Sequence, residues 1–288
     1  MMQTPITTYA LNKDEQKMLK EGHIHDVFAP IFSVLEKNTK ILLIQTQKHN
    51  TVFSPKELHE LNGKIAPMLG ELLVQNTQGD TRILVYDRDR LGSMQEGARY
   101  HQTREGGSIH TDNVNIPTLW DYLYLACISD AHIGGESILV DGIEVHRVLS
   151  QQFPKALKVL EQDFYWEMRG VGQELYQAPI ITYNEKMEPM FRHLRPYMES
   201  AHFRAKSPLS EEQLYAIDVL DAITNSTSMQ IRYRMNKGDI LLTVDSQILH
   251  GRCCFSDDLN SISYPEYLEG KAGPLKRTME RMWIKKLK

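Results

Sequence analysis

Apolar residues recur at helical spacing in two early stretches of the chain, residues 12–36 and 55–76. The second stretch begins at Ser54-Pro55, an N-cap residue with proline in the first turn. Two short apolar runs, residues 40–46 (KILLIQT) and 81–86 (TRILVY), are typical of buried strands. The first part of the chain is therefore expected to be mainly helical, with strands beginning beside it.

Strand patterns dominate the middle and the end of the chain. Residues 119–128 (LWDYLYLACI) and 136–142 (ESILVDG) predict two strands joined by a turn. Residues 143–163 have helical spacing, and the capping box at 210–213 predicts another helix from Ser210. More strands are expected at 229–235, at 240–244 and around 247–255. Because strands and helices do not alternate regularly, this order favours a β-sandwich or jelly roll with flanking helices over a doubly wound or TIM fold.

Composition narrows the class of protein. Hydrophobic residues make up 41% of the 288 residues, charged residues 24%, and the net charge is −4 with no basic cluster that would indicate nucleic-acid binding. No apolar run reaches the ~18 residues that a membrane helix needs, and the N-terminus lacks the layout of a secretory signal. Three cysteines make no disulfide framework. We therefore expect a cytoplasmic protein with no nucleic-acid or membrane partner, and leave open whether it forms a homo-oligomer.

Candidate chemistry centres on residues 106–113 (GGSIHTDN). If His110 and Asp112 lie on a strand, their side chains point to the same face and converge on one point. An isolated pair of this kind is more often a structural hydrogen bond. His250, in the strand predicted around 247–255, supplies a third donor. Two histidines and one carboxylate on one face are typical of non-haem iron(II) oxygenases, because the other metal positions stay open.

Four short motifs together resemble a known family. HTDN at 110–113, GGES at 134–137, VDG at 140–142 and LHGR at 249–252 are similar to the iron(II)/2-oxoglutarate oxygenases of the taurine dioxygenase (TauD/TfdA) superfamily, nearest the γ-butyrobetaine and trimethyllysine hydroxylase branch. The resemblance covers about residues 80–285. It implies an α+β fold with a double-stranded β-helix (jelly-roll) core and flanking helices. One domain would span residues 1–288, with a helical N-terminal part at 1–75 and a helical insertion at about 185–225.

The resemblance also implies roles for individual residues. The iron ligands would be His110, Asp112 and His250. Ser137 stands where the family usually has a threonine that helps bind 2-oxoglutarate. Arg277 and Arg281 are candidates for the arginine that binds the cosubstrate, because guanidinium pairs bidentately with carboxylate. We favour Arg277; a long segment after His250 leaves the choice open, and Arg252 is a third alternative.

The implied reaction is hydroxylation of an unactivated C–H bond, with O2 and 2-oxoglutarate as cosubstrates and succinate and CO2 as products. Desaturation and epoxidation are alternatives within the family. Two alternatives lie outside it. One is a zinc-dependent hydrolase on the same three ligands, which would not need Ser137 or the late arginines. The other is a non-catalytic binding module, against which the intact ligand set argues.

The substrate signal is weaker. Polar residues near the metal motif and before the second helix could contact substrate, namely Tyr100, His101, Gln102, Arg104, Arg192 and Arg195. The arginines would suit a small molecule that carries a carboxylate or phosphonate, although surface salt bridges explain them equally well. No zinc-binding cysteine set or aromatic cage indicates a carnitine precursor. We therefore expect an amino acid or amino-acid-derived metabolite, free or tethered to a carrier.

Overall fold

A computed structural model describes residues 5–35, 39–47, 53–88, 102–107, 109–114, 116–168, 172 and 174–287. Within these ranges the α-helices are α1 (Lys13–Lys20), α2 (Ile24–Phe32), α3 (Pro55–Ile65), α4 (Gly142–Gln152), α5 (Pro154–Leu160), α6 (Arg195–Arg204), α7 (Glu211–Asn225) and α8 (Tyr264–Leu268). The strands are β1 (Thr7–Ala10), β2 (Ile41–Gln45), β3 (Glu71–Leu72), β4 (Ile83–Val85), β5 (Tyr122–Ser129), β6 (Ile133–Gly134), β7 (Ser137–Asp141), β8 (Asp163–Glu167), β9 (Leu175–Pro179), β10 (Ile181–Tyr183), β11 (Pro189–Phe191), β12 (Gln230–Tyr233), β13 (Asp239–Val244), β14 (Ile248–Arg252), β15 (Phe255–Ser256) and β16 (Thr278–Lys285).

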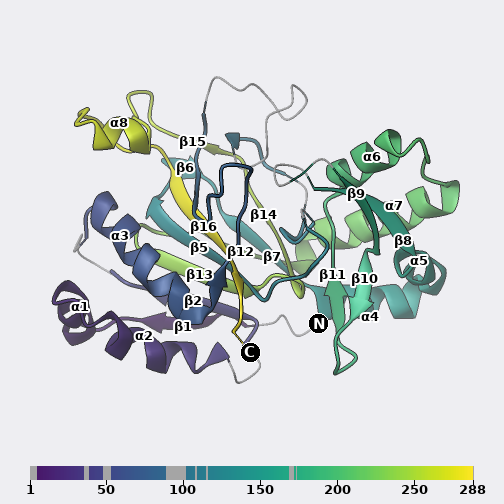
Figure 1. Cartoon of the computed structure of the whole chain (residues 1–288), viewed down its shortest axis with the longest axis horizontal. Coiled ribbons are helices and arrows are strands. Elements are labelled where there is room, and N and C mark those ends of the chain that lie inside the picture. The colour runs from purple at the N-terminus through teal and green to yellow at the C-terminus, as the bar shows by residue number, and fades with distance from the viewer. Residues whose placement is uncertain are drawn as a thin grey trace.

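Two sheets lie at the centre of the molecule (Figure 1). The larger sheet has the order β1-β2-β13-β5-β16-β3, with β4 also paired to β16, and the smaller has the order β12-β7-β14. Apolar side chains from the two sheets pack against each other. Leu241 and Met279 of the larger sheet share a cluster with Leu139 and Ile248 of the smaller one. The two sheets therefore face each other across a common core, as a sandwich does.

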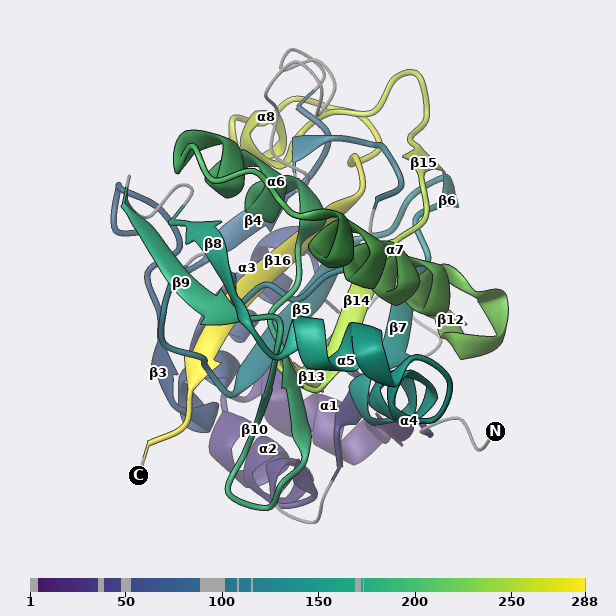
Figure 2. The same ribbon diagram turned by 90° about the vertical axis from the view of Figure 1, so that its right-hand side faces the viewer.

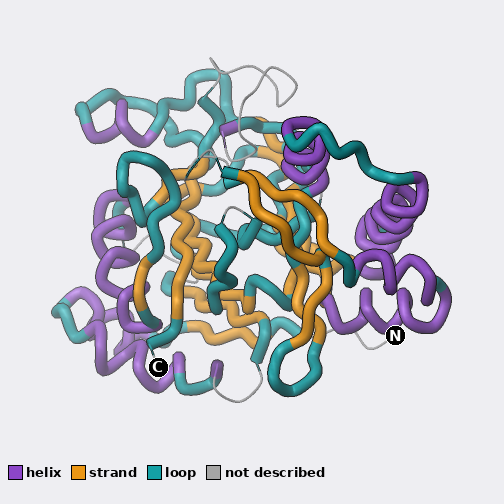
Figure 3. The backbone as a smooth tube through the Cα atoms, turned by 45° about the vertical axis from the view of Figure 1, so that its right-hand side comes forward, coloured by secondary structure: helices purple, strands orange, loops and turns teal. Residues whose placement is uncertain are grey.

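Helices cover the outer face of each sheet, as Figures 1 and 3 show. Helices α1, α2 and α3 place residues such as Phe28 and Leu58 against Tyr124 and Ile284 of the larger sheet. On the other side, α4, α5 and α7 lie over β7 and β14 (Figure 2), where Leu149 and Leu220 pack with Val140. Each central strand is thus buried on both faces, which explains why β2, β5 and β13 are nearly continuous apolar runs.

Most predicted elements are present, and the α+β class is confirmed. The capping box at Ser210 begins α7: the Ser210 hydroxyl accepts from the Gln213 N–H, and the Gln213 side chain accepts in return. Three helix predictions are wrong in detail. Residues 12–36 divide into α1 and α2, and the helix expected over residues 55–76 ends at Ile65, after which the chain continues into β3. The single helix expected over residues 143–163 divides into α4 and α5, because Phe153 leaves the helical region (φ −134°) and Pro154 starts a new first turn. Among the described residues, no helix combines the length and apolar character needed to cross a bilayer.

Candidate metal centre

His110 and His250 lie directly opposite each other in an isolated antiparallel bridge. The N–H of His110 donates to the carbonyl of His250 at 2.8 Å, and the reverse hydrogen bond is 2.7 Å. Their imidazole rings are consequently stacked at an angle, with centroids 4.4 Å apart. The main chain of β14 therefore fixes the spacing of two candidate ligands from distant parts of the sequence.

Asp112 reaches the same point from a bend rather than from a strand. The expectation that His110 and Asp112 share one strand face is wrong, because the pairing ends at His110. The buried Asp245, which follows β13, holds the bend instead. Its carboxylate accepts the N–H of Asp112 at 3.1 Å and the N–H of Asn113 at 3.0 Å. The convergence that the sequence predicts is present, with a different physical cause.

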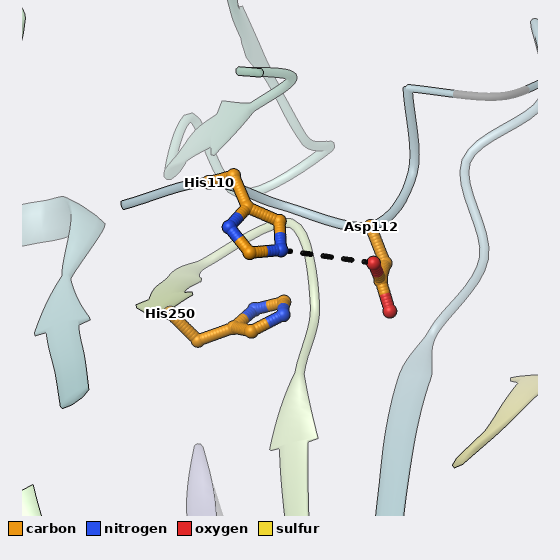
Figure 4. Close-up of side chains that lie close together, drawn as sticks. All are labelled: His110, Asp112 and His250. Carbon is orange, nitrogen blue, oxygen red and sulfur yellow. Dashed lines mark ion pairs between the residues drawn. The ribbon is translucent and has the colours of Figure 1, made fainter. Parts of the chain in front are cut away.

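The three side chains point toward one another (Figure 4). One ligand atom from each of His110, Asp112 and His250 lies within 4.8 Å of the other two, and His110 Nε2 is 3.9 Å from Asp112 Oδ1. Two imidazole nitrogens and one carboxylate oxygen at this spacing fit a divalent transition metal such as iron(II) or zinc. The donor set therefore suits the metal that the motifs imply.

The electrostatics of two of the three groups, His250 and Asp112, favour the protonation states that bind metal. Burial and the charge of His110 lower the pKa of His250 to about 3, so its imidazole is neutral at pH 7. Burial alone would raise the pKa of Asp112, but the Arg281 guanidinium and the two imidazoles bring it to about 2. Metal ligands must be deprotonated to bind, so both side chains are ready for a cation.

Strand β16 supplies two donors to the Asp112 carboxylate. Arg281 Nη1 donates to Oδ1 and the indole Nε1 of Trp283 donates to Oδ2, each at 3.0 Å. Neither contact is visible in the sequence as a metal motif. The only available signal is the spacing of Arg281 and Trp283, two residues apart on a strand and hence on one face.

The segment after β11 holds the metal motif from the other side. The N–H of Thr111 donates to the carbonyl of His193 at 2.8 Å, and the N–H of His193 donates to Thr111 Oγ1 at 3.0 Å. Asn113 Nδ2 donates to the carbonyl of Phe191 at 3.1 Å. The bend that carries Asp112 is therefore hydrogen-bonded both to the larger sheet's end and to the segment leading into α6.

The predicted cosubstrate residues lie around the same pocket. Ser137, Arg277 and Arg281 line it together with His110, Asp112 and His250. Arg277 lies over the ring of Phe255, with its guanidinium carbon 5.1 Å from the ring centroid. Arg252 also borders the pocket, but its guanidinium donates to the carbonyls of Thr103 (3.0 Å) and Glu105, which favours a role in holding that loop.

The predicted substrate residues are spread over different surroundings. Tyr100 and His101 lie outside the described residues. Gln102 lines a polar cavity of about 760 Å³ that also reaches Arg281. Arg104 pairs with Asp87 at 3.2 Å, and its side chain is 60% exposed.

Arg192 and Arg195 have internal partners. Arg192 donates to the carbonyls of Ile116 (2.9 Å) and Pro117 (2.7 Å). The carboxylate partners of Arg195 are Glu199, Asp218 and Asp221, at 2.7 to 2.9 Å. These contacts favour the salt-bridge and scaffold alternative for both arginines.

The cysteines offer no competing metal site among the described residues. Cys127, Cys253 and Cys254 are free, and Cys254 is exposed while Cys253 is half-buried. The described residues that could bind a metal as a group of three or more are His110, Asp112 and His250.

Comparison with known proteins agrees with this geometry. The chain is 24% identical over 228 residues to FR-33289 synthase of Streptomyces rubellomurinus; the match covers 77% of this chain and 62%, less than two thirds, of that protein. The fold is similar to a structure of an asparagine oxygenase in complex with Fe(II), 3-hydroxyasparagine and succinate, with a TM-score of 0.71, 12% identity, and coverage of 96% of this chain and 93% of that one. It is also similar to the non-haem iron oxygenase OrfP in complex with Fe and α-ketoglutaric acid, with a TM-score of 0.67, 15% identity, and coverage of 98% and 94%.

A family model describes most of the chain. Residues 35–270 match the model of the taurine catabolism dioxygenase TauD, TfdA family, and this range contains the three clustered side chains. The chain belongs to the TauD/TfdA dioxygenase family.

Proposed function

We propose that this protein is an iron(II)- and 2-oxoglutarate-dependent oxygenase that hydroxylates an unactivated C–H bond of a small amino-acid-derived molecule. The observation that carries the proposal is the cluster of His110, Asp112 and His250, with donor atoms within 4.8 Å of one another, in a pocket that also contains Ser137 and Arg277. Desaturation or epoxidation would use the same residues. Desaturation would differ from hydroxylation only after the hydrogen is removed, whereas epoxidation would transfer the oxygen atom to a C=C bond.

Each pocket residue has a role in this proposal. His110, Asp112 and His250 hold the iron, which with 2-oxoglutarate and O2 supplies the oxidising chemistry for C–H cleavage. Arg277 pairs with the distal carboxylate of 2-oxoglutarate, and the Ser137 hydroxyl hydrogen-bonds the same carboxylate. Arg277 is 3% exposed, so the pair is shielded from water.

We infer that the substrate is polar and enters beside Arg281. Arg281 lines both the metal pocket and the polar cavity of about 760 Å³, whose wall includes Gln75, Asp80, Arg88 and Gln102. Such a lining suits a small zwitterion better than an apolar molecule. Structures named as an asparagine oxygenase and as OrfP with hydroxyarginine share the fold, which is consistent with an amino acid, free or carrier-tethered. A place beside the γ-butyrobetaine branch stays a prediction.

We also propose that the facing sheets form the double-stranded β-helix of the family, within one domain that spans residues 1–288. Its support is that helices α1 to α3 pack on the same larger sheet that carries β16.

A binding experiment tests the metal and cosubstrate together. Iron(II) and then 2-oxoglutarate are added anaerobically to the metal-free protein, and the visible charge-transfer band of chelated iron is recorded. We expect the band in the wild type, its loss in His250→Ala, and its retention in His132→Ala, because His132 is exposed and lies outside the pocket. Tight zinc binding with no iron band would instead support the zinc hydrolase alternative.

Turnover measurements test the individual roles. His110→Ala or Asp112→Ala should abolish succinate release without unfolding the protein, and retained turnover would contradict the ligand assignment. Arg277→Ala should raise the 2-oxoglutarate KM far more than Arg281→Ala does. The opposite order would exchange the roles of the two arginines.

A further inference from the structure

The carboxylate of Asp112 has a hydrogen-bond donor on each oxygen, and both donors come from β16. Arg281 donates to Oδ1 and Trp283 to Oδ2, each at 3.0 Å. Alternation along the strand places these two side chains on the face that looks toward the smaller sheet, while Glu280 and Met282 point to the helices α1 to α3. The strand therefore presents a pair of donors to one carboxylate.

Trp283 is fixed in place independently of this hydrogen bond. Its side chain is 1% exposed and stacks on Trp120, with ring centroids 4.3 Å apart and planes 20° from parallel. The two indoles form a small apolar cluster with Leu123. Because stacking and burial hold the ring in one conformation, its N–H is already directed at Asp112 Oδ2.

Arg281 is also fixed by hydrogen bonds to Gln75, apart from its contact with Asp112. Its Nε donates to Gln75 Oε1 at 2.9 Å, and Gln75 Nε2 donates to the carbonyl of Arg281 at 3.0 Å. The guanidinium lies over the Trp283 ring, 5.0 Å from its centroid. The two donors thus support each other as well as the carboxylate.

We propose that Trp283 is a positioning residue for the metal site: its indole N–H sets the rotation of the Asp112 carboxylate and so directs Oδ1 toward His110 and His250. The inference rests on the proposed function of the cluster as a metal site. A terminal carboxylate torsion is soft, so donors on both oxygens fix the plane of the group more firmly than a donor on Oδ1 does. The donor on Oδ2 therefore restrains the rotation of the carboxylate. Hydrogen bonds of this kind orient ligands before the metal arrives, and losing one costs about 10–100-fold in metal affinity.

A packing role alone would give a different result, and Trp120 separates the two. Trp120 is 2% exposed and makes the same stacking contact, but its N–H has no hydrogen-bond partner among the described residues. Trp120→Phe and Trp283→Phe both replace an indole of the same stacked pair with a phenyl ring. Only Trp283→Phe also removes a donor to Asp112.

The experiment measures cobalt(II) binding to the metal-free protein by visible absorption, with the melting temperature recorded for each variant. We expect Trp283→Phe to raise the cobalt(II) Kd about 10–100-fold, and Trp120→Phe to leave it at the wild-type value, although both lower the melting temperature. Equal Kd values for wild type and Trp283→Phe would overturn the inference. Equal increases in both variants would also overturn it, because they would indicate packing.

The same titration keeps failure of the proposed function separate. If the wild type binds no cobalt(II), the metal site itself is refuted, whatever the variants do. If Trp283→Phe does not fold, the wild-type chain can be produced with β-(3-benzothienyl)alanine in place of tryptophan. In this analogue sulfur takes the place of the N–H in a ring of the same shape. Trp166→Phe carrying the same replacement is the matched sample, because Trp166 donates only to the carbonyl of Ala178. We expect a raised Kd in both samples, because both lose the Trp283 N–H that donates to Asp112; an unchanged Kd in both would overturn the positioning role.

Discussion

The bend that carries Asp112 depends on the carboxylate of Asp245, and removing that carboxylate should cost both stability and metal affinity. Asp245 is fully buried and accepts the N–H groups of Asp112 (3.1 Å) and Asn113 (3.0 Å). In Asp245→Ala both donors lose their partner inside the protein. A buried unsatisfied polar group costs about 1–3 kcal/mol, so we expect the unfolding free energy to fall by about 2–6 kcal/mol. That is a large part of the ~5–15 kcal/mol typical of a folded protein.

Asp245→Asn should be milder for two reasons. The amide oxygen still accepts one of the two N–H groups, so about half of the loss, ~1–3 kcal/mol, is expected. Burial and the negative charge of Asp112 also raise the pKa of Asp245, so a neutral side chain relieves repulsion between the two carboxylates. The order of stability should therefore be wild type, then Asp245→Asn, then Asp245→Ala.

Asp239 provides the matched control at the other end of β13. It is 2% exposed and accepts the N–H of Asn236 and the hydroxyl of Tyr233, each at 2.9 Å. Asp239→Ala should lower the unfolding free energy, measured by urea denaturation, and leave the cobalt(II) Kd unchanged. Asp245→Ala should change both. A loss of less than ~1 kcal/mol in Asp245→Ala, or an unchanged Kd, would refute the reasoning that this carboxylate holds the metal bend.

Three further predictions concern stability. Arg82→Ala should lower the unfolding free energy by about 3 kcal/mol in a urea titration, because Glu280 is fully buried and accepts from Arg82 Nε at 2.6 Å; a double variant with Glu280→Gln should recover part of the loss. Ser210→Ala should cost about 1 kcal/mol through loss of the α7 cap, with no change in metal affinity. Burial raises the pKa of Asp221, but the hydrogen bonds and charges of His193 and Arg195 together outweigh it and bring the pKa below its usual value. The stability from Asp221 is therefore present above its unfolded-state pKa and is lost as pH falls through the folded pKa, so Asp221→Asn should flatten the acid limb of the unfolding curve.

The sequence was sufficient where local patterns decide the structure. The Ser210 capping box starts α7 as predicted, and the apolar run at 40–46 is strand β2. The hairpin of β8 and β9 was not predicted, although DFYWE alternates Phe164 and Trp166 inward with half-buried Tyr165 between them. A strand there depends on its partner β9, and LYQAP carries almost no strand signal of its own.

The candidate metal ligands could be found because their chemistry is specific. Few patterns other than a metal site bring a histidine, an aspartate and a distant histidine together, and the structure has their donor atoms close. The convergence nevertheless does not come from a shared strand face. Asp112 lies in a bend, and the residue that holds it, Asp245, lies far along the chain. No repeating pattern of apolar and polar residues in the sequence relates Asp112 to Asp245.

Strand β16 shows why the contacts of Arg281 and Trp283 with Asp112 could not be predicted. It is a central strand, paired to β5 on one side and to β3 and β4 on the other, yet it contains Glu280 and Arg281 side by side. Alternation predicts that they face opposite ways, but adjacent charges usually indicate an exposed edge. Both charges are instead satisfied inside the protein, Glu280 by Arg82 and Arg281 by Asp112. Burial of a charge requires a partner, and both partners come from other segments of the chain. The ligands of the site can therefore be recognised by residue type, whereas the groups that orient them can be recognised only from their contacts.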